Sequence, residues 1–297
     1  MSSFAKAWTE IHEAKTLTER IYYISPLLLG LLKDVSTIIG LDRRRSASSN
    51  DEMERRIHEK NGKVLASLGA ESDRTFIKSG PFSGMEYTTA SAGSVLGAKL
   101  LGVYENELAE WVEQIASQDK YDTIIDVGCA EGYYANGFAY RCRRARVFAY
   151  DIDQRAQELA ASLARINGVE NRVTIAGVCS QDELQSRLIT AEHALVFVDI
   201  EGDEDELLDP KRIPGLLSAD IIVELHEHKR PGLTYRLLHR FAATHRVEIV
   251  AATPDEWKLQ LISDRTPDIL EIISEGRRIP QLWLRLSAVI QHRDEAR

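Results

Sequence analysis

One stretch, Tyr121–Ala139, constrains the fold of this chain more than any other. It reads YDTIIDVGCAEGYYANGFA: a β-branched, apolar run as far as Val127, small residues at Gly128, Ala130 and Gly132, and then an apolar run of helical character. This order predicts a buried parallel strand, a tight turn and a helix. Glycine has no Cβ, so such a turn lets the backbone approach a ligand, and the first N–H groups of the helix face the same ligand.

The spacing of small residues in this turn narrows the class of ligand. A dinucleotide site wants G-x-G-x-x-G after its strand, whereas here Asp126 precedes Gly128, Ala130 and Gly132. The pattern resembles the first motif of class I S-adenosylmethionine-dependent methyltransferases, D/E-x-G-x-G-x-G, with Ala130 in place of the middle glycine. The alternative is an ordinary corner between a strand and a helix.

Strand and helix patterns alternate from Tyr121 onward. After the first strand, further strands are expected at Arg146–Asp151, Arg172–Val178, Ala194–Ile200, Asp220–Leu225, Arg246–Ala252 and Leu282–Val289. Alternation of this kind predicts an α/β, Rossmann-like fold with a seven-stranded, mostly parallel sheet and helices on both faces. Between the last two strands only residues 267–275 could form a helix, so an antiparallel final strand is expected.

Two domains are expected. Residues 1–78 are predicted to form an N-terminal helical extension, in which Phe4, Trp8 and Ile11 fall near helical spacing. This extension is expected to pack on the main domain or on a second subunit, which makes it the candidate homodimer interface; a helix lying on a membrane surface is the alternative. Residues 79–297 are predicted to form the main domain. Its opening segment, 79–102, is rich in glycine and hydroxyl residues and is predicted to be a loop.

Composition and charge limit the partners. The net charge of −9 argues against a protein that wraps nucleic acid through phosphate contacts. Three cysteines make neither a disulfide framework nor a zinc spacing, and the first residues lack the apolar core of a signal peptide, so a cytoplasmic protein is expected. The apolar run Ile24–Leu32 is too short to span a bilayer.

The carboxyl ends of parallel strands are where ligands bind in open α/β sheets. The second strand delivers Asp151 there, and a carboxylate at this place can accept hydrogen bonds from both hydroxyls of a ribose. Asp153 is the better candidate for the cap of the next helix. The third strand delivers Cys179 and Ser180, which are expected either to contact an adenine or, for Ser180, to cap a helix with Glu183.

The fourth and fifth strand ends carry acidic and imidazole side chains. Asp199 and Glu201 follow the fourth strand, and Glu224, His226 and His228 come at the end of the fifth. If the fifth strand continues that far, alternation places its three residues on one face. Asp199, Glu201, Glu224 and His226 are therefore expected to be neighbours. A general base that accepts a hydroxyl proton is favoured; a divalent metal site and solvated strand ends are the alternatives.

Several segments together resemble the FkbM-like family of class I methyltransferases. They are GPFSGMEY, LLGVYENEL, IDVGCAEGYYA, RINGVENRV and FVDIEGDEDELL followed by IIVELHEH, within residues 80–252. The family's "YE" pair corresponds to Tyr104-Glu105, its glycine turn to 126–132 and its D-x-E-G-x-E motif to 199–204. The turn departs from some members at Cys129-Ala130-Glu131.

The resemblance implies O-methylation of a hydroxyl on a sugar or another small metabolite, with S-adenosyl-L-methionine as cofactor. Glu201 or His226 is expected to be the base, with Asp199 near the methionine end of the cofactor, so the catalytic set is Glu201, His226 and Asp199 and no metal is assigned. Tyr133, Tyr134 and residues 79–95 are expected to wall the substrate side. The expected cofactor contacts are Glu105, Asp126, Gly128, Ala130, Gly132, Tyr133, Asp151, Ile152, Cys179, Ser180 and Asp199.

Three other functions are compatible with this kind of sheet. A nicotinamide-dependent dehydrogenase lacks support from the glycine spacing, and about 120 residues precede the first strand here. A cofactor-binding partner subunit without catalysis is expected if the residues at the fourth and fifth strand ends face solvent. A protein or RNA methyltransferase is the third; the acidic charge weighs against RNA, and no N/D-P-P-Y-type motif follows the fourth strand.

Overall fold

The computed structural model describes residues 65, 74–91, 95–262, 269–275 and 281–289. All of them belong to one compact unit, Asn50–Arg297. The helical extension expected over residues 1–78, and with it the candidate dimer interface, lies outside the described residues except for residue 65 and residues 74–78. No helix within the described ranges has the length and apolar character that a membrane span needs.

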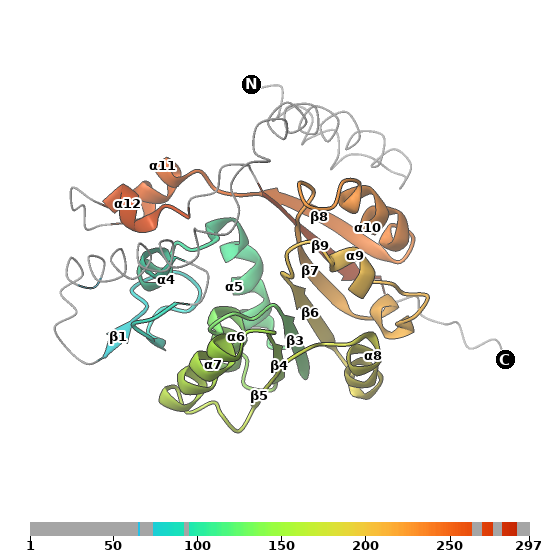
Figure 1. Ribbon diagram of the computed structural model, residues 1–297, viewed down its shortest axis with the longest axis horizontal. Coiled ribbons are helices and arrows are strands. Elements are labelled where there is room, and N and C mark those ends of the chain that lie inside the picture. The colour runs from blue at the N-terminus through green and yellow to red at the C-terminus, as the bar shows by residue number, and fades with distance from the viewer. Residues whose placement is uncertain (1–64, 66–73, 92–94, 263–268, 276–280, 290–297) are drawn as a thin grey trace. The chain divides into compact units, whose positions relative to one another are not determined.

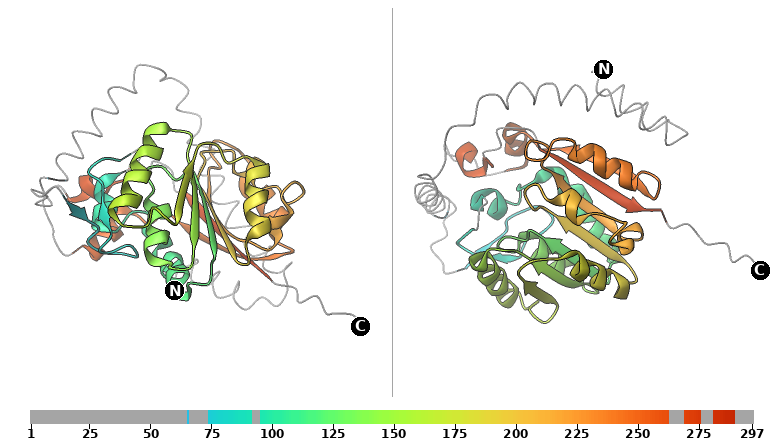
Figure 2. Two further views of the ribbon diagram at one scale, coloured as in Figure 1. Left: turned by 90° about the horizontal axis from the view of Figure 1, so that it is seen from below. Right: turned by 45° about the vertical axis from the view of Figure 1, so that its right-hand side comes forward.

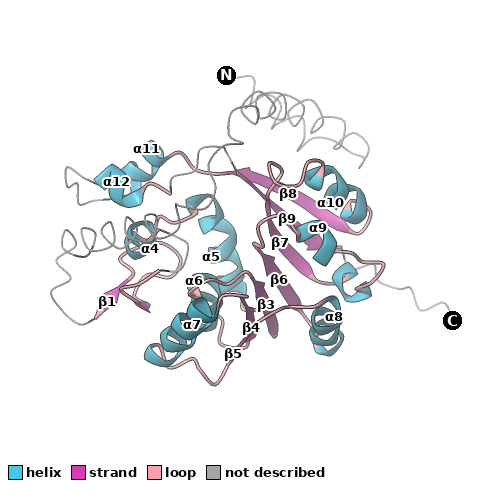
Figure 3. Ribbon diagram, viewed as in Figure 1, coloured by secondary structure: helices cyan, strands magenta, loops and turns pink. Residues whose placement is uncertain are grey.

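A seven-stranded sheet forms the centre of the described unit (Figure 1; Figure 3). Its strands are β3 (Thr123–Val127), β4 (Arg146–Tyr150), β5 (Val173–Ala176), β6 (Ala194–Val198), β7 (Asp220–Leu225), β8 (His245–Ala251) and β9 (Leu282–Ala288). A two-stranded sheet, β1 (Thr75–Phe76) with β2 (Glu86–Tyr87), precedes it.

The strand order across the sheet is β5-β4-β3-β6-β7-β9-β8. The strands β3 to β7 pair in parallel, while β9 runs antiparallel between β7 and β8. The chain builds the sheet outward from β3 to β5 and then returns to the other side of β3, so the switch point lies between β3 and β6. This order with an antiparallel last strand is the Rossmann-like fold of class I methyltransferases, as the sequence predicts.

Helices cover both faces of the sheet. The α-helices are α4 (Leu96–Leu101), α5 (Ala109–Gln118), α6 (Tyr133–Arg141), α7 (Gln154–Ile166), α8 (Gln181–Thr190), α9 (Glu204–Leu207), α10 (Leu233–Phe241), α11 (Asp255–Lys258) and α12 (Ile269–Ile273). Among the described residues, 3₁₀ turns occur at η2 (Asn106–Leu108), η3 (Pro214–Leu217) and η4 (Leu259–Leu261).

Alternation along the strands divides the core into two layers. Ile124 and Phe197 face one layer, which also takes buried residues of α4, α5, α6, α7 and α12. Ile125 and Val196, their neighbours in sequence, face the second layer with α8, η3 and α10. In Figure 2, left, the green helices lie on one side of the strands and the yellow and orange helices on the other. Because β3, β6 and β7 are buried on both faces, apolar residues stand at consecutive rather than alternating positions in them: Ile124–Ile125, Leu195–Val198 and Ile221–Val223.

The prediction that residues 79–102 form a loop is wrong for part of this segment. It contains β2 and the helix α4, whose six residues are all buried. A Cβ on Gly97 would overlap the backbone oxygen of Ile272, so this glycine serves the close packing of α4 on α12. Its small residues therefore belong partly to a helix contact, which a sequence pattern does not distinguish from loop chemistry.

Candidate functional site

The turn between β3 and α6 has the strained backbone that its small residues predict. Gly128, Ala130 and Gly132 all have positive φ, at 88°, 47° and 89°. Ala130 is the costly one, because a left-handed conformation costs an L-residue roughly 1–2 kcal/mol. The Ala130 N–H donates to Oδ2 of Asp151 at 2.8 Å, which holds the strained residue to the end of β4.

Gly128 has a second, steric reason to be glycine. A Cβ at this position would overlap the carbonyl oxygen of Asp199, at the end of β6. The Asp199 N–H in turn donates to the Val127 oxygen at 2.9 Å. The glycine turn and the end of β6 are therefore in direct backbone contact at the switch point of the sheet.

Asp151 lies at the end of β4, where the sequence places it. Its Oδ2 accepts from Ala130 and its Oδ1 from the Asp153 N–H, also at 2.8 Å. Each carboxylate oxygen has a further lone pair, so the group can still accept two hydroxyl donors. Asp153 caps α7 through the Arg155 N–H, which confirms the capping role expected for it.

Two exposed apolar side chains flank this acid. Ile152 is 85% exposed and Val178 is 72% exposed, and each stands two residues beyond a paired position of neighbouring strands, Tyr150 and Ala176. An exposed branched residue at each of two adjacent strand ends gives an apolar surface suited to a flat ring. Ile152 is among the cofactor contacts expected from the sequence and Val178 is not, although the register of parallel strands could have identified Val178.

Cys179 and Ser180 follow Val178, and they differ in role. Cys179 is buried, and burial raises the pKa of its thiol to about 12, so it is a neutral packing residue. Ser180 caps α8 by accepting from the Glu183 N–H at 3.1 Å. The capping role, one of the two expected for Ser180, is confirmed.

Carboxylates surround the glycine turn on its inner side. Asp126 is buried, and its Oδ2 accepts no hydrogen bond within the described part of the chain. Its pKa is raised to about 7, first by burial and then by the negative charges of Asp151 and Glu105. A buried acid next to two further acids favours a ligand that brings positive charge.

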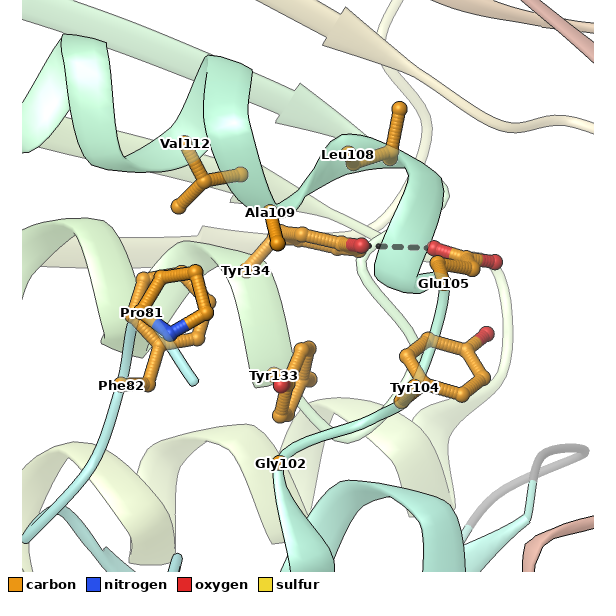
Figure 4. A pocket seen from close by; sticks show the side chains of 10 residues that line it. All are labelled: Pro81, Phe82, Gly102, Tyr104, Glu105, Leu108, Ala109, Val112, Tyr133 and Tyr134. Atoms are coloured by element: carbon orange, nitrogen blue, oxygen red, sulfur yellow. Dashed lines mark hydrogen bonds between the residues drawn. The ribbon is translucent and has the colours of Figure 1, made fainter. Parts of the chain in front are cut away.

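Glu105 belongs to a pocket that Figure 4 shows at close range. Its backbone is left-handed, with φ 44°, and its Oε2 accepts from the Tyr134 hydroxyl at 2.7 Å. The rings of Tyr133 and Tyr134 are buried and pack edge-on against Phe82, with centroids 5.2 and 6.0 Å away. The pocket lining is Pro81, Phe82, Gly102, Tyr104, Glu105, Leu108, Ala109, Val112, Tyr133 and Tyr134.

The acid–imidazole cluster (Asp199, Glu201, Glu204, Glu224 and His226) lies at the ends of β6 and β7. Nε2 of His226 is 3.6 Å from Asp199 Oδ1, 3.3 Å from Glu201 Oε2 and 3.4 Å from Glu224 Oε2. The expectation that four of these residues are neighbours is confirmed. Asp199, Glu224 and His226 offer ligand atoms that all lie within 4.8 Å of one another, so they could hold a metal ion.

The route to this cluster differs from the expected alternation along a strand. β7 ends at Leu225, so His226 and His228 lie in the turn after it and not on one strand face. Glu201 points back toward His226 because its backbone is left-handed, with φ 61°. Both acids of the D-x-E motif therefore face the same imidazole.

Glu204 is the member that sequence reasoning missed. It is fully buried, and its Oε1 lies 2.6 Å from Nδ1 of His226. The same oxygen accepts the Gly202 N–H at 3.0 Å, which ties the turn after β6 to the imidazole. The last position of the D-x-E-G-x-E motif was the available signal for it.

The pKa values of the two base candidates, His226 and Glu201, are shifted in opposite directions. Burial alone would lower the pKa of His226, but the hydrogen bond to Glu204 and the charges of Glu224, Glu204 and Glu201 outweigh it and raise that pKa above its ordinary value. Burial acts to raise the pKa of Glu201, but the ion pair with Lys229 and the charge of His226 lower it below its ordinary value. Glu201 is the exposed member of the cluster, at its outer side.

Comparison with solved structures finds similar proteins at low sequence identity. An O-methyltransferase from Bacillus cereus in complex with SAH is 11% identical, covers 86% of this chain and 97% of its own, and gives a TM-score of 0.42. A human methyltransferase 10 domain containing protein is 14% identical with coverages of 77% and 96% and a TM-score of 0.45. A methyltransferase from Geobacter sulfurreducens is 14% identical with coverages of 59% and 75% and a TM-score of 0.40. No protein-family model and no curated protein matches the chain.

Proposed function

We propose that this protein is an S-adenosylmethionine-dependent methyltransferase that transfers a methyl group to a hydroxyl of a sugar or another small metabolite. The observation that carries the proposal is the hydrogen bond from Ala130 to Asp151, which joins a left-handed small-residue turn to the acid at the next strand end. A turn open to backbone approach and an acid that can accept ribose hydroxyls are then parts of one site.

Charge supports a cationic cofactor over a dinucleotide. Asp126 and Asp151 lie at the strand ends beside the turn; burial first raises the pKa of Asp126, and the charges of Asp151 and Glu105 raise it further. S-adenosylmethionine carries a sulfonium and an ammonium group, which such a site attracts, whereas the pyrophosphate of a nicotinamide dinucleotide would be repelled. In this proposal the adenine packs on the exposed side chains of Ile152 and Val178.

The reaction would be an in-line displacement. The acceptor oxygen forms a bond to the methyl carbon while the carbon–sulfur bond breaks, and its electron pair stays on the sulfur of S-adenosylhomocysteine. The hydroxyl proton passes to a base, which we assign to Glu201 or His226 of the acid–imidazole cluster. Alignment of oxygen, carbon and sulfur can contribute several kcal/mol, up to about 7–11 in ideal cases, and a base contributes roughly 10²–10⁴-fold.

The backbone contact between Gly128 and Asp199 supports this division of labour, because it joins the cofactor turn to the strand end that carries Asp199 and Glu201. In this arrangement Asp199 faces the methionine end of the cofactor and the acceptor approaches from the side of Glu201.

The test is calorimetric titration of the full chain with S-adenosylhomocysteine and, separately, with NAD⁺. We expect micromolar binding of the first and none of the second. Asp151→Asn should weaken S-adenosylhomocysteine binding at least tenfold. Asp119→Asn is the matched control. Asp119 precedes the amino end of β3, away from the carboxyl ends that carry the proposed site, and Asn tolerates its left-handed backbone. Binding of NAD⁺ alone, or equal affinity in both variants, would reject the proposal.

A further inference from the structure

His226 is oriented by a buried carboxylate. With Nδ1 2.6 Å from Glu204 Oε1, the imidazole donates its Nδ1–H to that oxygen, and its neutral tautomer then has a lone pair on Nε2. A carboxylate behind an imidazole is the arrangement that fixes the tautomer of metal-binding histidines and makes the ring a better ligand.

The Nε2 atom points into a group of anionic oxygens. His226 is only 1% exposed, and no described residue gives its Nε2 a hydrogen bond. Oxygens of Glu201 and Glu224 lie within 3.4 Å of it but outside hydrogen-bonding geometry. A buried lone pair facing several carboxylates is unfavourable unless positive charge lies among them.

The separations fit ligands around one ion. Nε2 is 3.6 Å from Asp199 Oδ1 and 3.4 Å from Glu224 Oε2. Ligand atoms bound at 2.0–2.2 Å in a tetrahedron would be about 3.3–3.6 Å apart. All three ligand atoms come from positions close to the strand ends, so the sheet itself holds them together.

From this geometry we propose that Asp199, Glu224 and His226 form a binding site for a divalent transition-metal ion, with Glu204 positioning the imidazole. Carboxylates alone suit Mg²⁺ or Ca²⁺, while an imidazole with two carboxylates favours first-row ions such as Mn²⁺ or Zn²⁺. Glu201 is not assigned as a ligand, because it is exposed and paired with Lys229.

The role of this ion rests on the proposed function, although its binding does not. Asp199 adjoins the glycine turn, so the site would lie beside the reacting end of the cofactor. A metal ion supplies a Lewis acid that lowers the pKa of a bound hydroxyl. The lone pair of His226 would then be used for the metal, which leaves Glu201 as the base.

The site is tested directly by titrating the chelator-treated full chain with Mn²⁺. Binding is measured as the loss of the electron paramagnetic resonance signal of free Mn²⁺. We expect one saturable site per chain and competition by Zn²⁺. His226→Gln and Glu224→Gln should each weaken Mn²⁺ binding at least tenfold. Glu204→Gln should weaken it roughly 10–100-fold through the loss of its hold on the imidazole.

Two matched control variants carry the same substitutions, Glu to Gln and His to Gln, at residues outside the proposed metal site. Glu206→Gln removes an exposed acid two residues from Glu204, and His239→Gln removes an exposed-helix histidine on α10. Both should bind Mn²⁺ like the unchanged protein. Thermal unfolding of each variant shows whether it is folded, and Asp199→Asn replaces any ligand variant that is not.

Absence of a saturable Mn²⁺ or Zn²⁺ site in the unchanged protein would overturn the proposal, as would an equal loss in the control variants. The two proposals can fail separately. A metal site without S-adenosylhomocysteine binding would remove the methyltransferase assignment alone. S-adenosylhomocysteine binding without a metal site would remove the metal alone and return His226 to the base candidates.

Discussion

The carbonyl oxygen of Asp199 occupies the space that a side chain on Gly128 would fill. The contact brings two strand ends together at the point where the direction of sheet assembly reverses. It makes the shape of the glycine turn depend on where β6 ends, and it makes the position of Asp199 depend on a residue that has no side chain.

Gly128→Ala should therefore destabilise the protein strongly and abolish S-adenosylhomocysteine binding. The new Cβ meets backbone, which cannot rotate away, and φ of 88° is itself strained for alanine. We expect a loss of about 3 kcal/mol or more in the free energy of unfolding, measured by urea denaturation. Gly168→Ala is the control, because Gly168 has φ 64° but no atom within 4 Å of its Cβ, and it should cost only about 1 kcal/mol. Equal losses would show that strain alone, and not the Asp199 contact, decides the effect.

Asp126 should make stability fall as pH rises. Its pKa is about 7 in the folded protein against roughly 3.9 when unfolded. The folded state thus binds more protons between these values, so its stability is full below about pH 4 and declines as pH rises through 7. The free energy of unfolding of Asp126→Asn, relative to that of the unchanged protein, should be roughly 2–4 kcal/mol higher at pH 8 than at pH 4. Chemical denaturation at the two pH values measures this, and parallel pH profiles of the two proteins would contradict it.

The same acid should release a proton when the cofactor binds. The positive sulfonium and ammonium groups of S-adenosylmethionine favour the ionised carboxylate, so binding near pH 7 should lower the pKa of Asp126. Calorimetry in buffers of different ionisation enthalpy should then give different apparent binding enthalpies, and Asp126→Asn should lose most of that dependence. Identical enthalpies in all buffers would argue that Asp126 does not sense the ligand.

A buried ion pair joins the glycine turn to α4. Lys99 Nζ lies 2.7 Å from Oε1 of Glu131, and both side chains are buried; the Tyr87 hydroxyl donates to the same oxygen at 2.9 Å. Lys99→Met should cost about 3–5 kcal/mol of unfolding free energy, because it leaves a charged acid without its cation.

Two further variants test the cause of that loss. Lys99→Met with Glu131→Gln should recover part of the stability, because the uncompensated charge is gone. Lys120→Met, which breaks a half-exposed pair with Asp220, should cost about 1 kcal/mol or less. If the double variant were no more stable than Lys99→Met, lost packing rather than lost charge would be responsible.

The central sheet was predictable because its signals are local. The run Asp220–Leu225 is apolar apart from Asp220 and Glu224 and forms β7 over those same residues. Asp151 followed from its place at a strand end. Parallel strands place such ends at one edge whatever the loops between them do, so the neighbours in the acid–imidazole cluster could be inferred from topology.

The unpredicted parts depend on contacts between distant segments or on one backbone angle. Gly97 was predicted to be a loop residue because no residue near it in sequence indicates its close contact with the backbone of Ile272. Glu201 faces His226 only because its φ is positive, a conformation that residue type does not predict. Glu204 reaches the imidazole from a short helix whose position is set by the rest of the fold.

The position of β9 has a consequence for how the protein is made. β9 is the last strand described, yet it lies between β7 and β8 and is the strand with which β8 pairs in the sheet. While the chain is still emerging from the ribosome, β8 has no neighbour in this sheet and β7 is an open edge, until residues 282–288 have been synthesised and released. Exposed strand edges invite association with other chains, so the nascent protein is vulnerable to aggregation from the synthesis of β7 until β9 is available, after its glycine turn has already been made.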